Sequence, residues 1–155
     1  PVNMGLAETE GTLSFYKQSI SHLGSFLPVN RHSKDSLGYA SSANNDLSEV
    51  SVTSLDTFCS RSNITNVDLL KIDVQGYEVA VLKGAMQTLP KVRCCTIEVN
   101  FFDFYQNSSS LLEVETIMNQ SSHRICDIAK VSKNPKNLRT DWVELVYINQ
   151  LLCEL

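Results

Sequence analysis

The sequence predicts an α/β fold, and three features indicate it. Residues 69–72 are a short, mostly apolar run of the kind found in strands that are buried on both faces of a sheet. Gly76 permits a sharp turn soon after this run, and apolar or small residues then recur at the spacing of one helix face over residues 77–84. A second apolar strand is predicted at residues 92–99. Strands that alternate with helices are typical of a sheet covered by helices.

The composition fits one domain and argues against several classes of protein. The chain has 155 residues, 43% of them hydrophobic, which is enough for one domain with its own core. A net charge of −4 argues against a broad nucleic-acid or anionic membrane surface. No apolar run approaches the roughly 20 residues of a membrane span. The five cysteines have no CxxC spacing, so we expect no metal site.

The compartment and the oligomeric state stay open at this point. Three N-x-S/T sequons occur, at Asn63, Asn107 and Asn119, but such triplets arise often by chance. No signal-peptide pattern opens the chain, whose first residue is Pro1.

The N-terminal region is predicted to hold two strands and a long loop. Residues 2–7 and 12–16 are the expected strands. Residues 17–48 are rich in Ser and Asn and contain only scattered apolar side chains, so we expect a long flexible loop, disordered or loosely held on the surface. The alternative is a substrate lid that is anchored by three apolar residues, Leu23, Phe26 and Leu27.

A short strand and a helix are expected before the central run. Val50 and Val52 indicate the strand. Ser54 is a suitable N-cap for a helix that extends to about Arg61, and the helix dipole favours the carboxylate of Asp56 in the first turn. Asp56 is then a structural residue, and a role in cofactor binding is the alternative.

Asp73 and Glu98 are the candidate catalytic residues. Asp73 follows the first buried strand, and ligands of open α/β sheets lie just beyond the carboxyl ends of strands. A surface Asp that caps a helix is the alternative. Glu98 lies at the end of the second strand, where a buried acid is either neutralised by a partner or functional. Lys71 also needs a partner, so we expect it to form a salt bridge with Asp73 or Glu98.

The C-terminal part is predicted to contain a helix and two more strands. Residues 101–105 form an aromatic cluster that either packs in the core or walls a substrate pocket. Ser110 and Glu113 form a capping box before an apolar stripe, which predicts a helix. Strands follow at residues 123–128 and 142–148, and the second is apolar at nearly every position, so we expect it to be central.

The central stretch resembles the hallmark of the FkbM-type methyltransferases. KIDVQGYE followed by VLKGA is similar to the family pattern K-I-D-x-E-G-x-E followed by a hydrophobic residue, Leu, x, Gly and Ala. Gln75 stands where the family usually has Glu. The segments SLDTF, residues 54–58, and TIEV, residues 96–99, also resemble family motifs. The matching residues of the central stretch are Lys71, Ile72, Asp73, Gly76, Glu78, Leu82, Gly84 and Ala85.

The resemblance implies a fold and an activity. The fold is the Rossmann-like class I methyltransferase sheet of order 3-2-1-4-5-7-6, which binds S-adenosylmethionine where the strand order switches. Asp73 would end strand 4 and Glu98 strand 5, both beside the transferred methyl group, and Asp73, Gln75 and Gly76 would contact the cofactor. The implied reaction is O-methylation of a hydroxyl on a sugar, polyketide or similar small molecule or glycan. A carboxylate would remove the proton of that hydroxyl or orient it.

One part of the family pattern is missing. The chain contains no G-x-G-x-x-G-like turn before a helix and no acidic residue that ends a second strand. We therefore expect residues 1–155 to be a fragment that lacks the N-terminal Gly-rich half and does not bind S-adenosylmethionine alone. Residues 69–72 would then be an edge strand or pair with the N-terminal segment. A non-catalytic methyltransferase-like interaction module is the alternative function.

Overall fold

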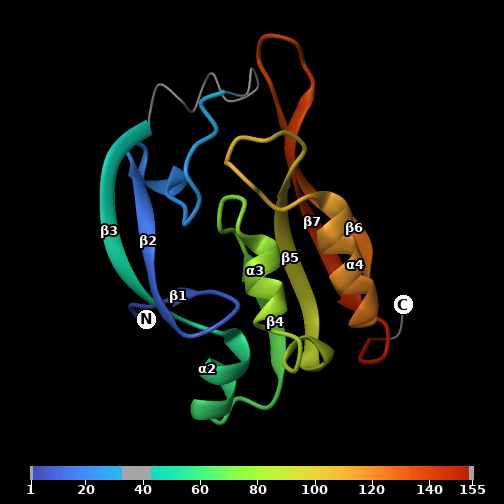
Figure 1. The fold of residues 1–155 in the computed structure, drawn as a ribbon. Helices are drawn as coiled ribbons and strands as arrows, with labels where there is room; N and C mark the ends of the chain where they lie inside the picture. Colours follow the sequence, from blue (N-terminus) through green and yellow to red (C-terminus); the bar gives the residue numbers. More distant parts are fainter. Residues whose placement is uncertain (1, 33–42, 154–155) are drawn as a thin grey trace.

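The structure is a computed structural model that describes residues 2–32 and 43–153 and contains two sheets (Figure 1). The smaller sheet consists of β1 (Gly5–Leu6), β2 (Gly11–Gln18) and β3 (Ala43–Thr53). β3 is the middle strand, parallel to β1 and antiparallel to β2. The N-terminal segment therefore pairs with β3 and not with the central run of the sequence.

The larger sheet has the order β4-β5-β7-β6. β4 and β5 run parallel, whereas β7 is antiparallel to both of its neighbours. The central position predicted for the last strand is confirmed, since β7 lies between β5 and β6. The strands are β4 (Val67–Ile72), β5 (Val92–Asn100), β6 (His123–Lys133) and β7 (Thr140–Asn149).

Helices cover one face of the larger sheet (Figure 1). Buried residues of β4, β5 and β7 pack there against the apolar sides of the helices in one core cluster. Of the helices that the structure describes, none is both long and apolar enough to span a membrane. The helices are α2 (Leu55–Arg61), α3 (Glu78–Lys83) and α4 (Leu111–Gln120), with 3-10 turns η1 (Ser21–Leu23) and η3 (Leu89–Lys91).

β4 is an edge strand, and this part of the sequence prediction is confirmed for the described residues. The expectation that residues 69–72 are buried on both faces is wrong. Ile72 points into the core, but Leu69 is 61% exposed, because the helices cover only the other face of the sheet. The periodicity of a short apolar run does not distinguish a strand covered on both faces from an edge strand covered on one.

Two predicted helix starts are confirmed. The hydroxyl of Ser54 accepts a hydrogen bond from the backbone N–H of Thr57 at the start of α2, and Ser110 and Glu113 form a capping box at the start of α4. Asp56 is structural: its carboxylate accepts the backbone N–H groups of Gln87 and Thr88 and the hydroxyl of Thr88. These bonds connect α2 to the segment that follows α3.

The predicted boundaries of the loop over residues 17–48 are wrong at both ends. β2 continues to Gln18, and β3 begins at Ala43 and pairs with β2. The strand expected at residues 12–16 lies within β2, but residues 43–49 are mostly polar and gave no signal for the first half of β3. Residues 33–42 of the expected loop lie outside the described residues, and its flexibility stays a prediction.

The described part of that loop packs on the turn after β4. The ring of Phe26 lies 5.4 Å from those of Phe15 and Tyr77. A backbone hydrogen bond runs from the N–H of Asn30 to the carbonyl of Phe104. The apolar residues thus anchor the loop above the turn, while a role of the loop as a substrate lid stays a prediction.

Gly84 generates the first testable prediction. A Cβ built on Gly84 would lie only 2.2 Å from the carbonyl oxygen of Ala7, which contacts the end of α3. We expect Gly84→Ala to lower the free energy of unfolding by about 1–3 kcal/mol, since backbone segments would have to separate. Urea unfolding measures this, with Lys83→Ala as an exposed control on the same helix. Equal stability of the two variants would contradict the close approach.

Candidate active site

The two candidate catalytic carboxylates meet at the side-chain amide of Gln75. β4 and β5 are parallel and in register, with Ile72 opposite Ile97, so Asp73 and Glu98 lie at the same end of the sheet. The amide nitrogen Nε2 of Gln75 lies 3.0 Å from Oδ1 of Asp73 and 3.0 Å from Oε1 of Glu98. One amide therefore donates both of its hydrogens to the pair of carboxylates.

Gln75 is held in this position by contacts from two other segments, the loop that contains Ser25 and the segment after β5. Its φ of 54° places the backbone in the left-handed region, which is uncommon for a residue other than glycine. Its backbone carbonyl accepts a hydrogen bond from the hydroxyl of Ser25 at 2.8 Å. The buried hydroxyl of Tyr105 lies 3.1 Å from Oε1 of Gln75 and 3.0 Å from the carbonyl oxygen of Leu23. The side-chain amide of Gln75 is thus fully engaged within the chain.

The carboxyl of Glu98 has a strongly raised pKa. The pKa of Glu98 is raised from 4.5 to about 7, mainly by partial burial and next by the nearby charge of Asp73. The hydrogen bond from Gln75 and the charge of Lys71 lower it again in part. A carboxyl with a pKa near neutrality can both accept and release a proton at physiological pH.

Lys71 contacts a predicted partner and one that the sequence did not indicate. Its Nζ lies 3.6 Å from Oδ2 of Asp73, which confirms the expected salt bridge. Its shorter contact, at 2.8 Å, is with Oε1 of Glu144 on β7. The hydrogen bond between them raises the pKa of Lys71 and lowers that of Glu144. Glu144 lies directly opposite Glu98 across β5 and β7, a register that local sequence patterns do not contain.

Gly76 and Glu78 build the turn that carries Gln75. Gly76 has a φ of 95°, so the sharp turn predicted there is confirmed. Its N–H donates to Oε1 of the buried Glu78 at 2.9 Å, and its carbonyl accepts bonds from the N–H and hydroxyl of Ser109. Burial raises the pKa of Glu78. A Cβ on Gly76 would lie 3.0 Å from Ser108, so the turn packs tightly against the segment before α4.

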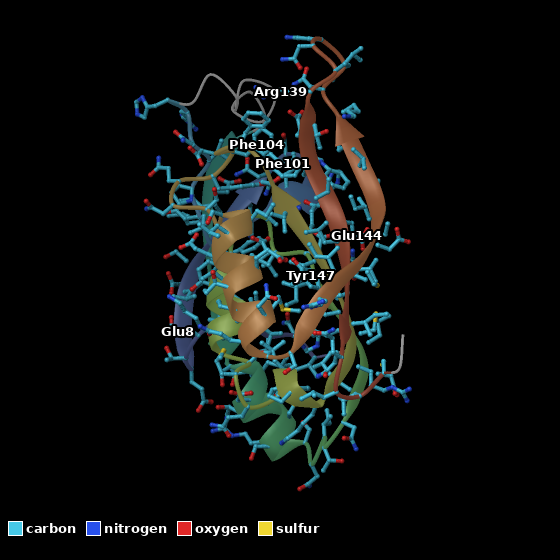
Figure 2. All side chains as sticks on the ribbon, turned by 90° about the vertical axis from the view of Figure 1, so that its right-hand side faces the viewer. Glu8, Phe101, Phe104, Arg139, Glu144 and Tyr147 are labelled. Carbon is cyan, nitrogen blue, oxygen red and sulfur yellow. The ribbon has the colours of Figure 1, made fainter. Side chains whose placement is uncertain are left out.

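Some residues of the aromatic cluster after β5 pack in a core, and another lines a pocket, so both roles that the sequence left open occur. Phe104 and Tyr105 are buried and form a small core with Val29. Phe101 is 45% exposed and lines a pocket. Figure 2 shows Phe101, Phe104 and Arg139 gathered at one end of the molecule. Among residues 2–32 and 43–153, no group of three or more His, Cys, Asp or Glu side chains is arranged to hold a metal ion.

The raised pKa of Glu98 predicts a pH dependence of stability. Because the folded-state pKa of about 7 exceeds the ordinary 4.5, the folded chain holds this proton more tightly than the unfolded chain. Glu98 therefore stabilises the fold fully below about pH 4.5, and this contribution is lost as the pH rises through about 7. We expect urea unfolding to show this decline in the wild type and a smaller one in Glu98→Gln. Identical pH profiles would contradict the prediction.

Comparison with known proteins agrees with the motifs at this site. A family model described as the methyltransferase FkbM domain matches residues 1–125, which include β4, α3 and β5. No curated protein and no solved structure matches the chain. The family match covers most of the 155 residues and contains Asp73, Gln75, Gly76 and Glu98. The chain therefore belongs to the FkbM methyltransferase domain family.

Proposed function

We propose that this chain carries the methyl-transfer site of an S-adenosylmethionine-dependent methyltransferase that acts on a hydroxyl group of a small molecule or glycan, such as a sugar or polyketide. The observation that carries the proposal is the pair of Asp73 and Glu98, joined by one amide at the carboxyl ends of adjacent parallel strands. Ligands of open α/β sheets bind at this end. Membership of the FkbM methyltransferase domain family supports the reaction class.

We also infer that the larger sheet is part of a class I methyltransferase sheet. Its order β4-β5-β7-β6 has the same sequence of strands as the last four positions of the order 3-2-1-4-5-7-6. The parallel pair followed by antiparallel strands is consistent with this inference. β4 would then be strand 4, and its free edge would face the cofactor-binding half of such a sheet.

The charge of the site suits the cofactor. S-adenosylmethionine, when bound, supplies an electrophilic methyl group on a positively charged sulfonium. The side chain of Asp73 is 37% exposed, so its carboxylate can approach a cationic ligand. The amide of Gln75 already bonds Asp73, Glu98 and Tyr105, and Gly76 is packed under Ser108. In this proposal Gln75 and Gly76 therefore serve the cofactor by positioning Asp73.

Glu98 is the proposed acceptor of the proton that the substrate hydroxyl loses. A general base works best when its pKa lies near the operating pH, and the pKa of Glu98 is raised to about 7. The negative charge of Asp73 increases this pKa. The two carboxylates thus have different roles: Asp73 stays charged beside the cofactor, and Glu98 accepts the proton. Lys71 contacts Asp73 and Glu144 and thereby leaves Glu98 without a cation at salt-bridge distance among the described residues.

Substitution of the two carboxylates tests their role. In the protein that contains this chain, we expect Asp73→Asn and Glu98→Gln to lower the rate of methyl transfer roughly 10²–10⁴-fold, the range of a positioned acid or base. The midpoint of urea unfolding should change far less. Asp68→Asn is the matched control, because Asp68 is an exposed aspartate on β4, the strand that leads to Asp73. Near-wild-type turnover of both variants would show that these acids are structural.

A non-catalytic interaction module is the second candidate function. Two observations favour it: the amide of Gln75 already occupies an oxygen of each carboxylate, and the free edge of β4 could pair with a strand of a partner. The two candidate functions differ in cofactor binding: an enzyme binds S-adenosylmethionine, whereas a non-catalytic module does not.

Calorimetric titration with S-adenosylmethionine distinguishes the two functions. We expect the protein that contains this chain to bind the cofactor, and Asp73→Asn to weaken binding by about tenfold, as for one charged contact. Absence of binding heat in the wild type would favour the module. That the 155-residue chain does not bind the cofactor alone stays a prediction, which the same titration of this chain checks.

A further inference from the structure

The salt bridge between Lys71 and Glu144 crosses a whole strand of the larger sheet. β5 lies between β4, which carries Lys71, and β7, which carries Glu144. Neighbouring strands lie about 4.8 Å apart, so β4 and β7 are separated by about 10 Å. Nζ of Lys71 nevertheless lies 2.8 Å from Oε1 of Glu144. The two side chains therefore span β5 together.

The residues of β5 at this crossing are Thr96 and Glu98. Thr96 is the partner of Lys71 in the register of β4 and β5, and Glu98 is the partner of Glu144 in the register of β5 and β7. Alternate residues of a strand point to the same face, so Thr96 and Glu98 share the face that is not covered by the helices. The ammonium of Lys71 thus lies close enough to Glu98 for its charge to lower the pKa of that carboxyl.

Three carboxylates surround Lys71, and Glu144 holds it most closely. The distance from Nζ of Lys71 is 2.8 Å to Glu144 and 3.6 Å to Asp73, while Glu98 lies beyond salt-bridge distance. The hydrogen bond from Lys71 lowers the pKa of Glu144, and a hydrogen bond from the side chain of Thr96 contributes to this. Glu144 is therefore ionised at neutral pH and is the main anchor of the ammonium.

The remaining charged groups near the bridge do not take over this part. Lys130 on β6 is the register partner of Glu144 and lowers its pKa, and its Nζ lies 4.8 Å from the ring centre of Trp142. Burial and then the charge of Asp73 raise the pKa of Glu98, and the charge of Glu78 adds to the rise. Lys71 is the cation that opposes it. A movement of this ammonium toward Glu98 would strengthen that opposition.

We propose that Glu144 is a positioning residue of the methyl-transfer site, which holds the ammonium of Lys71 against β7 and so keeps Glu98 free to accept a proton. Without the carboxylate of Glu144, Lys71 turns to Asp73 and Glu98. Either contact makes Glu98 a weaker base: a bond to Glu98 stabilises its charged form, and a closer bond to Asp73 reduces the repulsion between the two carboxylates. The role of Glu98 as the base rests on the proposed function, whereas the position of Lys71 does not.

Nuclear magnetic resonance measures the first consequence without any methyl transfer. The side-chain carboxyl carbon of Glu98 reports its pKa in the carbon-13-labelled chain, and the wild type should give about 7. We expect Glu144→Gln to lower this pKa by at least about 1, the smaller effect of an opposite charge that moves close to a carboxyl. An unchanged or higher pKa would overturn the proposal.

A matched control removes the same charge elsewhere on the sheet. Asp127 is exposed on β6, where it is the register partner of Val146. We expect Asp127→Asn to leave the pKa of Glu98 unchanged. A fall as large as that in Glu144→Gln would show a general effect of net charge and would contradict a specific role of Glu144.

A double-mutant cycle separates the effect of Lys71 from direct repulsion between Glu144 and Glu98. Lys71→Met alone should raise the pKa of Glu98, because the charge of Lys71 lowers it in the wild type. Addition of Glu144→Gln to Lys71→Met should then leave the pKa unchanged. A fall of equal size in both backgrounds would show that Glu144 acts on Glu98 directly, and the proposal would be wrong.

The pH dependence of methyl transfer connects this arrangement to catalysis. The acidic limb of kcat/KM reports the pKa of the base in the free enzyme. In the protein that contains this chain, we expect Glu144→Gln to move this limb to lower pH by the same amount as the pKa measured by nuclear magnetic resonance. A limb that stays in place while the measured pKa falls would remove Glu98 as the base and leave the position of Lys71 standing. An unchanged pKa of Glu98 in an active enzyme would remove only the role of Glu144.

Discussion

The turn between β4 and α3 is the constraint on which the rest of the site depends. Two consecutive residues, Gln75 and Gly76, have positive φ, and only the second can adopt this conformation without strain. Hydrogen bonds from Ser25 and Ser109 to the two carbonyls, and from the N–H of Gly76 to Glu78, hold the turn from three sides. The strained backbone at Gln75 directs its side-chain amide back between the carboxylates of Asp73 and Glu98.

The distribution of charge around this amide explains why one carboxyl differs from the others. Glu98 and Glu144 lie directly opposite each other on β5 and β7, an arrangement that is unfavourable when both are ionised. Lys71 contacts Glu144 and Asp73 and offsets part of their negative charge. Burial and the charge of Asp73 raise the pKa of Glu98 to about 7, and the hydrogen bond from the neutral amide of Gln75 offsets this rise only in part. Burial therefore determines, more than the position of the cation, which carboxyl holds a proton near neutral pH.

Much of the framework could be predicted from the sequence, because it depends on local signals. The cap at Ser54, the capping box of α4 and the turn at Gly76 each need only residues that are close in the chain. The partners Glu144 and Tyr105 were missed, because their contacts depend on strand register and on a loop that returns to the turn. The part of β3 before Val50 was missed for a different reason: residues 43–49 are mostly polar and show no apolar alternation. Contacts distant in sequence, and polar strands, leave little trace in periodicity.

Gln75 illustrates how one departure from the family pattern changes the physics of the site. A glutamate at this position could accept hydrogen bonds but, when ionised, could donate none. The carboxylates of Asp73 and Glu98 would repel the carboxylate of that glutamate. At least one of the three groups would then have to hold a proton to relieve the repulsion. The amide removes this conflict, because its two N–H groups satisfy Asp73 and Glu98 at once and its oxygen accepts the hydroxyl of Tyr105. Gln75 therefore keeps the two carboxylates together without adding a negative charge, and it couples their position to the loop that packs on Tyr105.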